Sequence, residues 1–215
     1  MPVHGRVVLE GIRFAADVAS DPSGIVTLWK AATGGKAVGC LPATPIPELL
    51  LAAGLLPMAL ESPEDLSLLS GQFDAWLVGV DPSPFPVPSE GIPRFVFPRL
   101  APGSVEEALD QVEALAEWAS AVSGSPASEG ALWKSIRAHA TRRSLLDALD
   151  ERCAREPAFL TPEERRDIVR VGIFLPPEAH SRLLSSILGI DPEPAAIAAE
   201  GERGDPLIVL AKRLM

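Results

Sequence analysis

The sequence is poor in the residues that several classes of protein require. It holds 2 cysteines in 215 residues, too few for a disulfide-rich secreted scaffold or for a zinc site built from four cysteines. Basic residues are also scarce, with 19 Lys and Arg against 29 Asp and Glu and a net charge of −10. Nucleic-acid binders need a basic surface that displaces counterions, and anionic membranes attract basic segments. We therefore expect neither nucleic acid nor membrane among the partners of this chain.

Long apolar runs are missing as well. The longest, residues 49–60, contains Gly54 and Pro57 and falls short of the ~20 residues that a membrane-spanning helix needs. Residues 1–10 carry no apolar stretch of the kind found in signal peptides. The low cysteine content also fits a reducing compartment. The sequence therefore predicts a cytoplasmic protein.

Compact catalytic motifs are absent too. The chain has no G-x-G-x-x-G or G-x-x-x-x-G-K-[ST] phosphate loop and no G-x-S-x-G nucleophile turn. The histidines, His4, His139 and His180, have no spacing typical of metal ligands. We expect His139 to be an exposed structural residue of a helix, and Cys40 and Cys153 to be small buried apolar residues rather than nucleophiles or ligands.

What the first half of the chain does contain is a series of short apolar runs separated by helical patterns. The apolar runs predict strands at residues 36–41, 55–60, 74–80 and 94–97. The helical patterns lie at 7–19, 23–32 and 47–53, and a further helix begins with the cap residue Ser62. Residues 81–88 contain four prolines and predict an extended loop. Strands separated by helices indicate an α/β fold with a doubly wound parallel sheet of about four strands.

The second half of the chain is helical in character. Capping boxes at 104–107 and 161–164 each mark a helix start. Apolar residues at helical spacing predict helices at 104–123, 132–153, 161–171 and 178–188. We expect an N-terminal α/β domain at 1–102, a helical region at 103–190 and a loose tail at 191–215. Within that tail, Leu207 to Leu210 form an apolar run that predicts a terminal strand.

One segment of the predicted sheet is a candidate ligand site. Residues 39–54 run from a strand through a proline-containing loop into the start of a helix. Open α/β sheets bind ligands at the carboxyl ends of their strands, and Thr44 and Glu48 are the polar groups offered there. A structural interpretation is also open, in which Thr44 shapes the loop and Glu48 complements the positive end of the helix dipole. Spacing alone favours the structural interpretation.

The order of these motifs resembles that of the 2-hydroxyacyl-CoA dehydratase / benzoyl-CoA reductase subunit family, including subunits like the D component of 2-hydroxyglutaryl-CoA dehydratase. GGKAVGCL at 34–41, followed by PELLLAAGLLP at 47–57, is similar to the first motif of that family. FDAWLVGV at 73–80 is similar to its second strand motif, and FVFPRL at 95–100 resembles the element before its long helix. The likeness runs in order through nearly all of residues 23–189, and it implies a Rossmann-like α/β fold.

The resemblance also implies what this chain lacks. Family members are iron–sulfur proteins that carry a second α/β domain, and a [4Fe–4S] cluster needs about four ligands, mostly thiolates. Pro42 and Ala43 stand where the first motif often has Cys and Ser, and Val80 and Asp81 stand where a Cys-Asp pair is expected. We therefore expect no metal and no cofactor in this chain and assign no catalytic residue. The candidate ligand pocket implied by the motifs consists of Thr44, Glu48 and Asp81.

The function implied by the resemblance is that of a shortened, cluster-free relative. Such a chain would act as an accessory or partner subunit of a dehydratase- or reductase-like complex, or as an acyl-CoA-related binding protein. The expected partner is a homologous or cysteine-bearing subunit. Two alternatives stay open: an active component whose [4Fe–4S] or acyl-CoA site is completed by a partner chain, and a structural module without a ligand.

Overall fold

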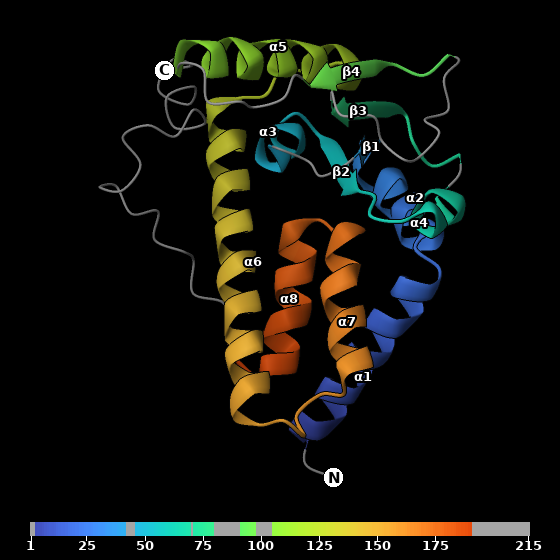
Figure 1. Ribbon diagram of the computed structural model, residues 1–215, viewed down its shortest axis with the longest axis vertical. Coiled ribbons are helices and arrows are strands. Elements are labelled where there is room, and N and C mark those ends of the chain that lie inside the picture. The colour runs from blue at the N-terminus through green and yellow to red at the C-terminus, as the bar shows by residue number, and fades with distance from the viewer. Residues whose placement is uncertain (1–2, 42–45, 70, 80–90, 98–104, 191–215) are drawn as a thin grey trace. The chain divides into compact units, whose positions relative to one another are not determined.

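A computed structural model describes residues 3–41, 46–69, 71–79, 91–97 and 105–190. The described residues belong to two compact units (Figure 1). The sheet unit lies within residues 29–135, and the helical unit lies within 3–28 and 136–190. Two helices, α2 (Ser23–Thr33) and α6 (Glu129–Arg155), contribute residues to both units.

The sheet unit is built on four parallel strands in the order β2-β1-β3-β4. They are β1 (Lys36–Leu41), β2 (Leu55–Ala59), β3 (Ala75–Gly79) and β4 (Arg94–Phe97). Five consecutive residues of β1 are buried, as expected of a central strand covered on both faces. The predicted α/β class with a parallel sheet of about four strands is therefore confirmed.

Tight packing at the centre of this sheet depends on a glycine. Trp76 of β3 is almost fully buried and lies beside Gly39 of β1, its partner in the ladder. A Cβ atom added at Gly39 would lie 2.4 Å from the Trp76 ring, so no larger residue fits unless the indole moves. The ring of Phe73 packs against the same indole, with 4.6 Å between the ring centroids.

Three helices accompany the strands of the sheet unit. They are α3 (Pro47–Ala52), α4 (Pro63–Leu68) and α5 (Val105–Ser123). Helix α5 packs on β4, where the rings of Phe95 and Trp118 lie 5.5 Å apart. It ends before Gly124, whose φ of 84° is the left-handed conformation that glycine adopts without strain.

The helical unit packs α1 (Val3–Ser20) against α7 (Pro162–Arg170) and α8 (Pro177–Leu188). A short 3-10 helix, η1 (Val171–Ile173), joins α7 to the segment before α8. The predicted capping box at the start of α7 is present: the Glu164 amide donates to Thr161 Oγ1 at 3.2 Å, and the Thr161 amide donates to Glu164 Oε2 at 2.7 Å. These two bonds satisfy backbone donors that the first turn of a helix leaves without partners.

Most predicted elements match the structure within a few residues, but the predicted exposure of two side chains differs from the structure. His139 was expected to be exposed, yet it is only 6% exposed. It falls on the same stripe of α6 as Leu132 and Leu149, and that helical spacing decides its burial more than its charged sequence neighbours do. Cys153, expected to be buried, is half-buried.

Some predictions concern residues outside the described ranges. These are the proline loop 81–88, the cap residue Ser104 and the tail 191–215 with its terminal strand. The predicted domain boundaries also stay a prediction. Residues of one compact unit contact one another, but this does not show that the unit folds independently. Within the described residues, no helix combines the length and the apolar character needed to cross a membrane.

Candidate functional site

The strand order brings the carboxyl ends of β1 and β3 together at the centre of the sheet. These strands pair directly, with Leu41 opposite Val78. From β1 the chain continues to β2 on one side, and from β3 it continues to β4 on the other. Open parallel sheets bind ligands in the crevice that forms where successive connections diverge in this way. The candidate site is therefore the carboxyl edge of β1 and β3.

Glu48 is the predicted pocket residue that lies within the described structure. It is half-buried in the first turn of α3, the helix that follows β1. Ile46 precedes this helix and makes no side-chain cap, so the carboxylate is the acidic group of the first turn, where the helix dipole favours negative charge. No hydrogen bond or ion pair joins Glu48 to another described residue. Thr44 and Asp81 lie outside the described residues.

The acidic residue that follows β2 has a structural role instead. Asp65 is 2% exposed, and its Oδ2 accepts hydrogen bonds from the amides of Glu61 at 3.1 Å and Ser62 at 3.0 Å. Its own amide donates to Ser62 Oγ at 3.2 Å, which completes a capping box. A carboxylate held in this way fixes the turn between β2 and α4 and is occupied by backbone donors.

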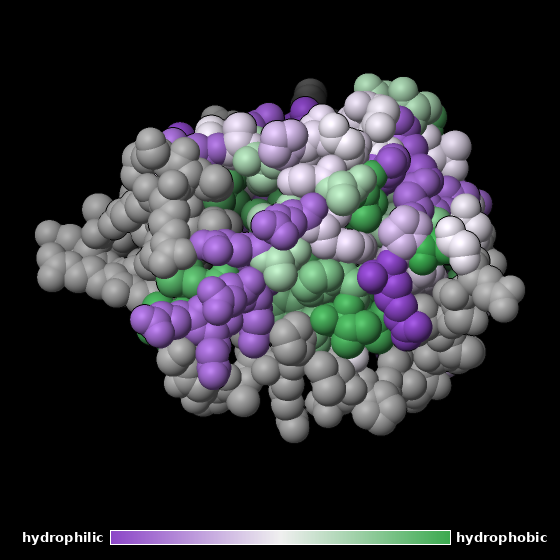
Figure 2. Space-filling view, turned by 90° about the horizontal axis from the view of Figure 1, so that it is seen from above, coloured by the Kyte–Doolittle hydropathy of each residue, from purple (hydrophilic) through white to green (hydrophobic). Residues whose placement is uncertain are grey.

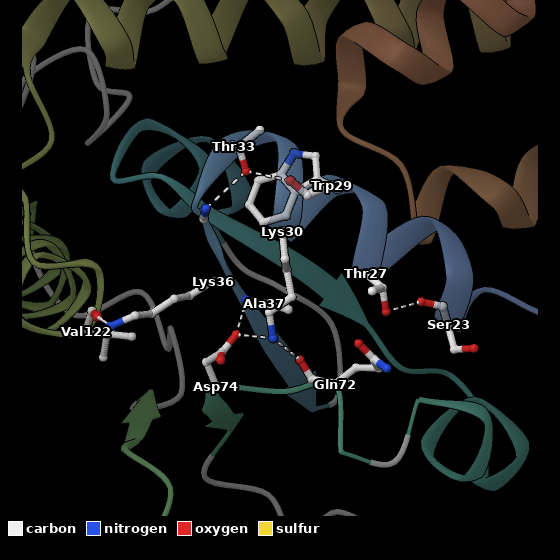
Figure 3. Close-up of polar contacts among 11 residues, drawn as sticks. Ser23, Thr27, Trp29, Lys30, Thr33, Lys36, Ala37, Gln72, Asp74 and Val122 are labelled. Carbon is white, nitrogen blue, oxygen red and sulfur yellow. Dashed lines mark hydrogen bonds and ion pairs between the residues drawn. The ribbon is translucent and has the colours of Figure 1, made fainter.

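A connected polar cluster of the sheet unit lies at the opposite, amino-terminal edge (Figure 3). Asp74, just before β3, accepts at Oδ2 from the Ala37 amide at 2.7 Å and from Lys30 Nζ at 2.7 Å. Lys30 Nζ also donates to the Gln72 carbonyl oxygen at 2.9 Å. Sequence analysis missed this cluster, because its members are brought together only by the pairing of β1 with β3.

The cluster around Asp74 positions the strands. It ties α2 to the starts of β1 and β3, while Lys36 Nζ donates to the Val122 carbonyl oxygen of α5 at 2.6 Å (Figure 3). Every charged group here is matched by an opposite charge or a backbone dipole. Because ligands of parallel sheets bind at the other edge, we assign this cluster to the alignment of the sheet.

His180 is the most perturbed titratable group of the helical unit. It is 1% exposed, and its Nε2 lies 2.8 Å from the Ile168 carbonyl oxygen, which places the ring proton on Nε2. Burial lowers the pKa of His180 to about 4; the hydrogen bond to Ile168 opposes this shift, and the charge of Arg142 adds to it. Nδ1 is buried and has no hydrogen-bond partner among the described residues. His180 is therefore neutral near pH 7.

The surroundings of His180 explain how its ring is accommodated. A Cβ atom added at Gly172 of η1 would lie 2.4 Å from His180 Nδ1, so the ring occupies the space that the missing side chain leaves. Arg142 donates to the Gly172 carbonyl oxygen at 3.2 Å and thereby holds η1 beside α6. These contacts describe a packed structural histidine.

Neither cysteine fits the cluster chemistry of the family that the sequence resembles. Cys40 is buried inside β1, with its thiol 3.6 Å from the Val38 carbonyl oxygen. Cys153 lies on α6, where burial raises the pKa of the thiol, nearby Arg165 lowers it and Asp150 raises it. Among the described residues, no group of three or more His, Cys, Asp and Glu side chains could hold a metal ion. Two cysteines placed in this way cannot supply the ligands of a [4Fe–4S] cluster.

No protein-family model matches the chain, and no curated protein matches it. The fold and the site define an α/β protein with a four-stranded parallel sheet, joined through α2 and α6 to a helical unit. The family resemblance of the motifs stays a prediction.

Proposed function

We propose that this chain is a shortened, cluster-free relative of the 2-hydroxyacyl-CoA dehydratase / benzoyl-CoA reductase subunits, acting as an accessory subunit that binds an acyl-CoA-related ligand. The ligand site is the carboxyl edge of β1 and β3, with Thr44, Glu48 and Asp81 as its polar groups. One observation carries the proposal. The segments that hold these residues directly follow the two strands that the sheet order makes neighbours at its centre, where open sheets bind ligands.

The chemistry of the three side chains indicates which part of the ligand they would contact. Two are carboxylates in a chain of net charge −10, and carboxylates repel phosphate but accept hydrogen bonds from amide and hydroxyl donors. The acyl-pantetheine end of a CoA thioester offers such donors. Glu48 and Asp81 therefore suit the pantetheine arm, and the proposal leaves the nucleotide phosphates outside this pocket.

The proposed partner is a cysteine-bearing homologous subunit in the cytoplasm. Such a partner supplies the soft ligands that this chain does not contain at the corresponding positions. The accessory role follows because the partner would hold the cluster, and a subunit without its own cluster can still position a thioester for a neighbour that has one.

Benzoyl-CoA, with free CoA as the comparison, provides the test of ligand binding. A ligand that binds only the native state raises the melting temperature, by an amount equivalent to about 2.7 kcal/mol at 100 times Kd. We expect benzoyl-CoA to stabilise the chain more than free CoA does, and Glu48→Ala to remove most of that gain. Glu64→Ala is the matched control, since Glu64 occupies the first turn of α4 after the outer strand β2. Equal stabilisation of all three chains, or of none, would overturn the proposed site.

Iron analysis tests the accessory role separately. The chain purified anaerobically by itself should contain no stoichiometric iron or acid-labile sulfide, and co-expression with a cysteine-bearing homologue should give a complex that contains both. A stoichiometric cluster in the isolated chain would overturn the cluster-free assignment and favour the alternative of an active component.

A further inference from the structure

Helix α7 is buried to a much smaller extent than α8, the helix that follows it. Ile168 is the buried residue among the nine of α7, whereas eight of the twelve residues of α8 are buried. The ion pairs of α7 lie at the surface: Arg165 binds Asp150 through side chains that are 48% and 56% exposed. Such exposed pairs contribute little to stability. The buried packing of α7 therefore depends on one apolar side chain.

An exposed apolar residue does not by itself distinguish α7 from other elements. Figure 2 shows that hydrophobic residues are exposed among hydrophilic ones on the surface of the molecule, and Val169 of α7 is 43% exposed. Single residues of this kind are common on protein surfaces. What distinguishes α7 is that one of its residues is buried along its whole length.

The chain is anchored on both sides of α7. Before the helix, Leu160 is buried, and the guanidinium carbon of Arg152 lies 4.5 Å from the centre of the Phe159 ring. After the helix, Val171 and Phe174 are fully buried. Segments with few buried apolar contacts open locally at a lower free energy than the core does. An opening of α7 would therefore begin and end at fixed points of the chain.

The backbone at the end of α7 has the features of a hinge. At Val171 the α-helix changes to the 3-10 helix η1, and such a change often marks a hinge. Just before this point, His180 Nε2 lies 2.8 Å from the Ile168 carbonyl oxygen and joins the last turn of α7 to α8. The hydrogen bond and the buried side chain belong to the same residue of α7. Ile168 is therefore the point at which α7 is fastened.

We propose that α7 is a strap of the helical unit, which opens by itself while α1 and α8 stay folded and closes again on Ile168. Opening separates the Ile168 carbonyl oxygen from His180 and uncovers the part of α1 against which α7 packs. Leu160 and η1 stay in place as the two ends of the strap. This inference is independent of the proposed ligand and of the proposed partner.

Amide hydrogen exchange of the full chain at neutral pH, resolved by residue with NMR, tests the strap. A substitution accelerates exchange only through openings that break its contacts. Ile187 is fully buried in α8 and lies beside Gly11 of α1, and these contacts persist when α7 alone opens. Ile187→Ala should accelerate exchange of the α8 amides 183–188 at least about tenfold and change that of the α7 amides 166–170 less than about twofold.

The matched control is Arg165→Gln, which removes the exposed ion pair with Asp150 and should change exchange in either helix less than about fivefold. Equal acceleration of the α7 and α8 amides by Ile187→Ala would overturn the proposal, because α7 would then open only when the whole unit unfolds. Unprotected α7 amides in the unsubstituted chain would overturn it as well, because the strap would then not close.

A second measurement on the unsubstituted chain decides if Ile187→Ala fails to fold. At low urea concentrations, the free energy of each opening falls with a slope that grows with the surface it exposes. The α7 amides should report an opening with a small slope, and the α8 amides one with a larger slope. A single slope shared by both helices overturns the strap.

Discussion

The titratable groups described above in the sheet unit are bonded differently from His180 in the helical unit. In the sheet unit, Asp65 and Asp74 each accept backbone amide hydrogen bonds, and Lys30 is matched by Asp74 and a carbonyl oxygen. In the helical unit, His180 is buried with one ring nitrogen bonded, and the other has no partner in the part of the chain that the structure describes. Charged groups whose bonds are made fix a structure over a wide range of conditions, whereas a buried neutral base becomes costly once it binds a proton. Packing should therefore limit the stability of the sheet unit, and pH that of the helical unit.

The largest effect expected from this comparison concerns packing in the sheet unit. Trp76→Ala removes a nearly fully buried indole beside Gly39 and should lower the free energy of unfolding by about 3–5 kcal/mol. Urea denaturation measures the loss. Trp118→Ala, at the half-buried ring that contacts Phe95, is the control and should cost clearly less. Equal losses in the two variants would show that Trp76 beside Gly39 contributes no more to the free energy of unfolding than Trp118 does.

The next largest effect is acid destabilisation of the helical unit. The folded pKa of His180 is about 4 against 6.5 for the free side chain, so between these values the unfolded state binds more protons. Stability is therefore complete above pH 6.5 and is lost as the pH falls toward 4, by about 3 kcal/mol in total. Urea unfolding at a series of pH values measures this slope.

The control for that prediction is the same series on His180→Gln, which cannot bind the proton. The substituted chain should be less stable at pH 7 and should show a shallower loss between pH 6.5 and 4. Amide exchange should locate the acid-sensitive opening in α7 and α8. If the two chains lose stability in parallel, carboxylate protonation elsewhere causes the acid sensitivity, and the contrast between the two units fails.

Features that depend on residues close together in the sequence were predicted better than features that depend on contacts between distant residues. The boundaries of β1 and β4 follow directly from apolar runs, and the helix starts at Ser62 and Thr161 follow from capping residues a few positions apart. The burial of His139 depends on which stripe of α6 faces the protein. Charged sequence neighbours conceal that stripe, and so the prediction of an exposed histidine was wrong.

Long-range contacts were not predictable in the same way. Asp74 precedes a strand, but nothing near it in the sequence indicates that Lys30 and the Ala37 amide converge on its carboxylate. Of the predicted pocket, the structure describes Glu48 alone. A doubly wound sheet allows β1 and β3 to be adjacent strands. The position of the candidate site follows from this pairing.

The smallest expected effect concerns the ion pair of the sheet unit. Asp74→Asn keeps an oxygen that can accept from the Ala37 amide but removes the charge that faces Lys30. The side chains of Lys30 and Asp74 are 26% and 31% exposed, so solvent weakens the pair, and the loss should stay below about 1 kcal/mol. Asp74→Ala also leaves the Ala37 amide without its acceptor and should cost more, about 1–3 kcal/mol. Because a partly exposed ion pair is screened by salt, the cost of Asp74→Asn should shrink at high ionic strength, while the cost of Asp74→Ala should largely remain. Equal costs at low salt would mean that charge, and not the bond to the backbone, aligns β1 with β3.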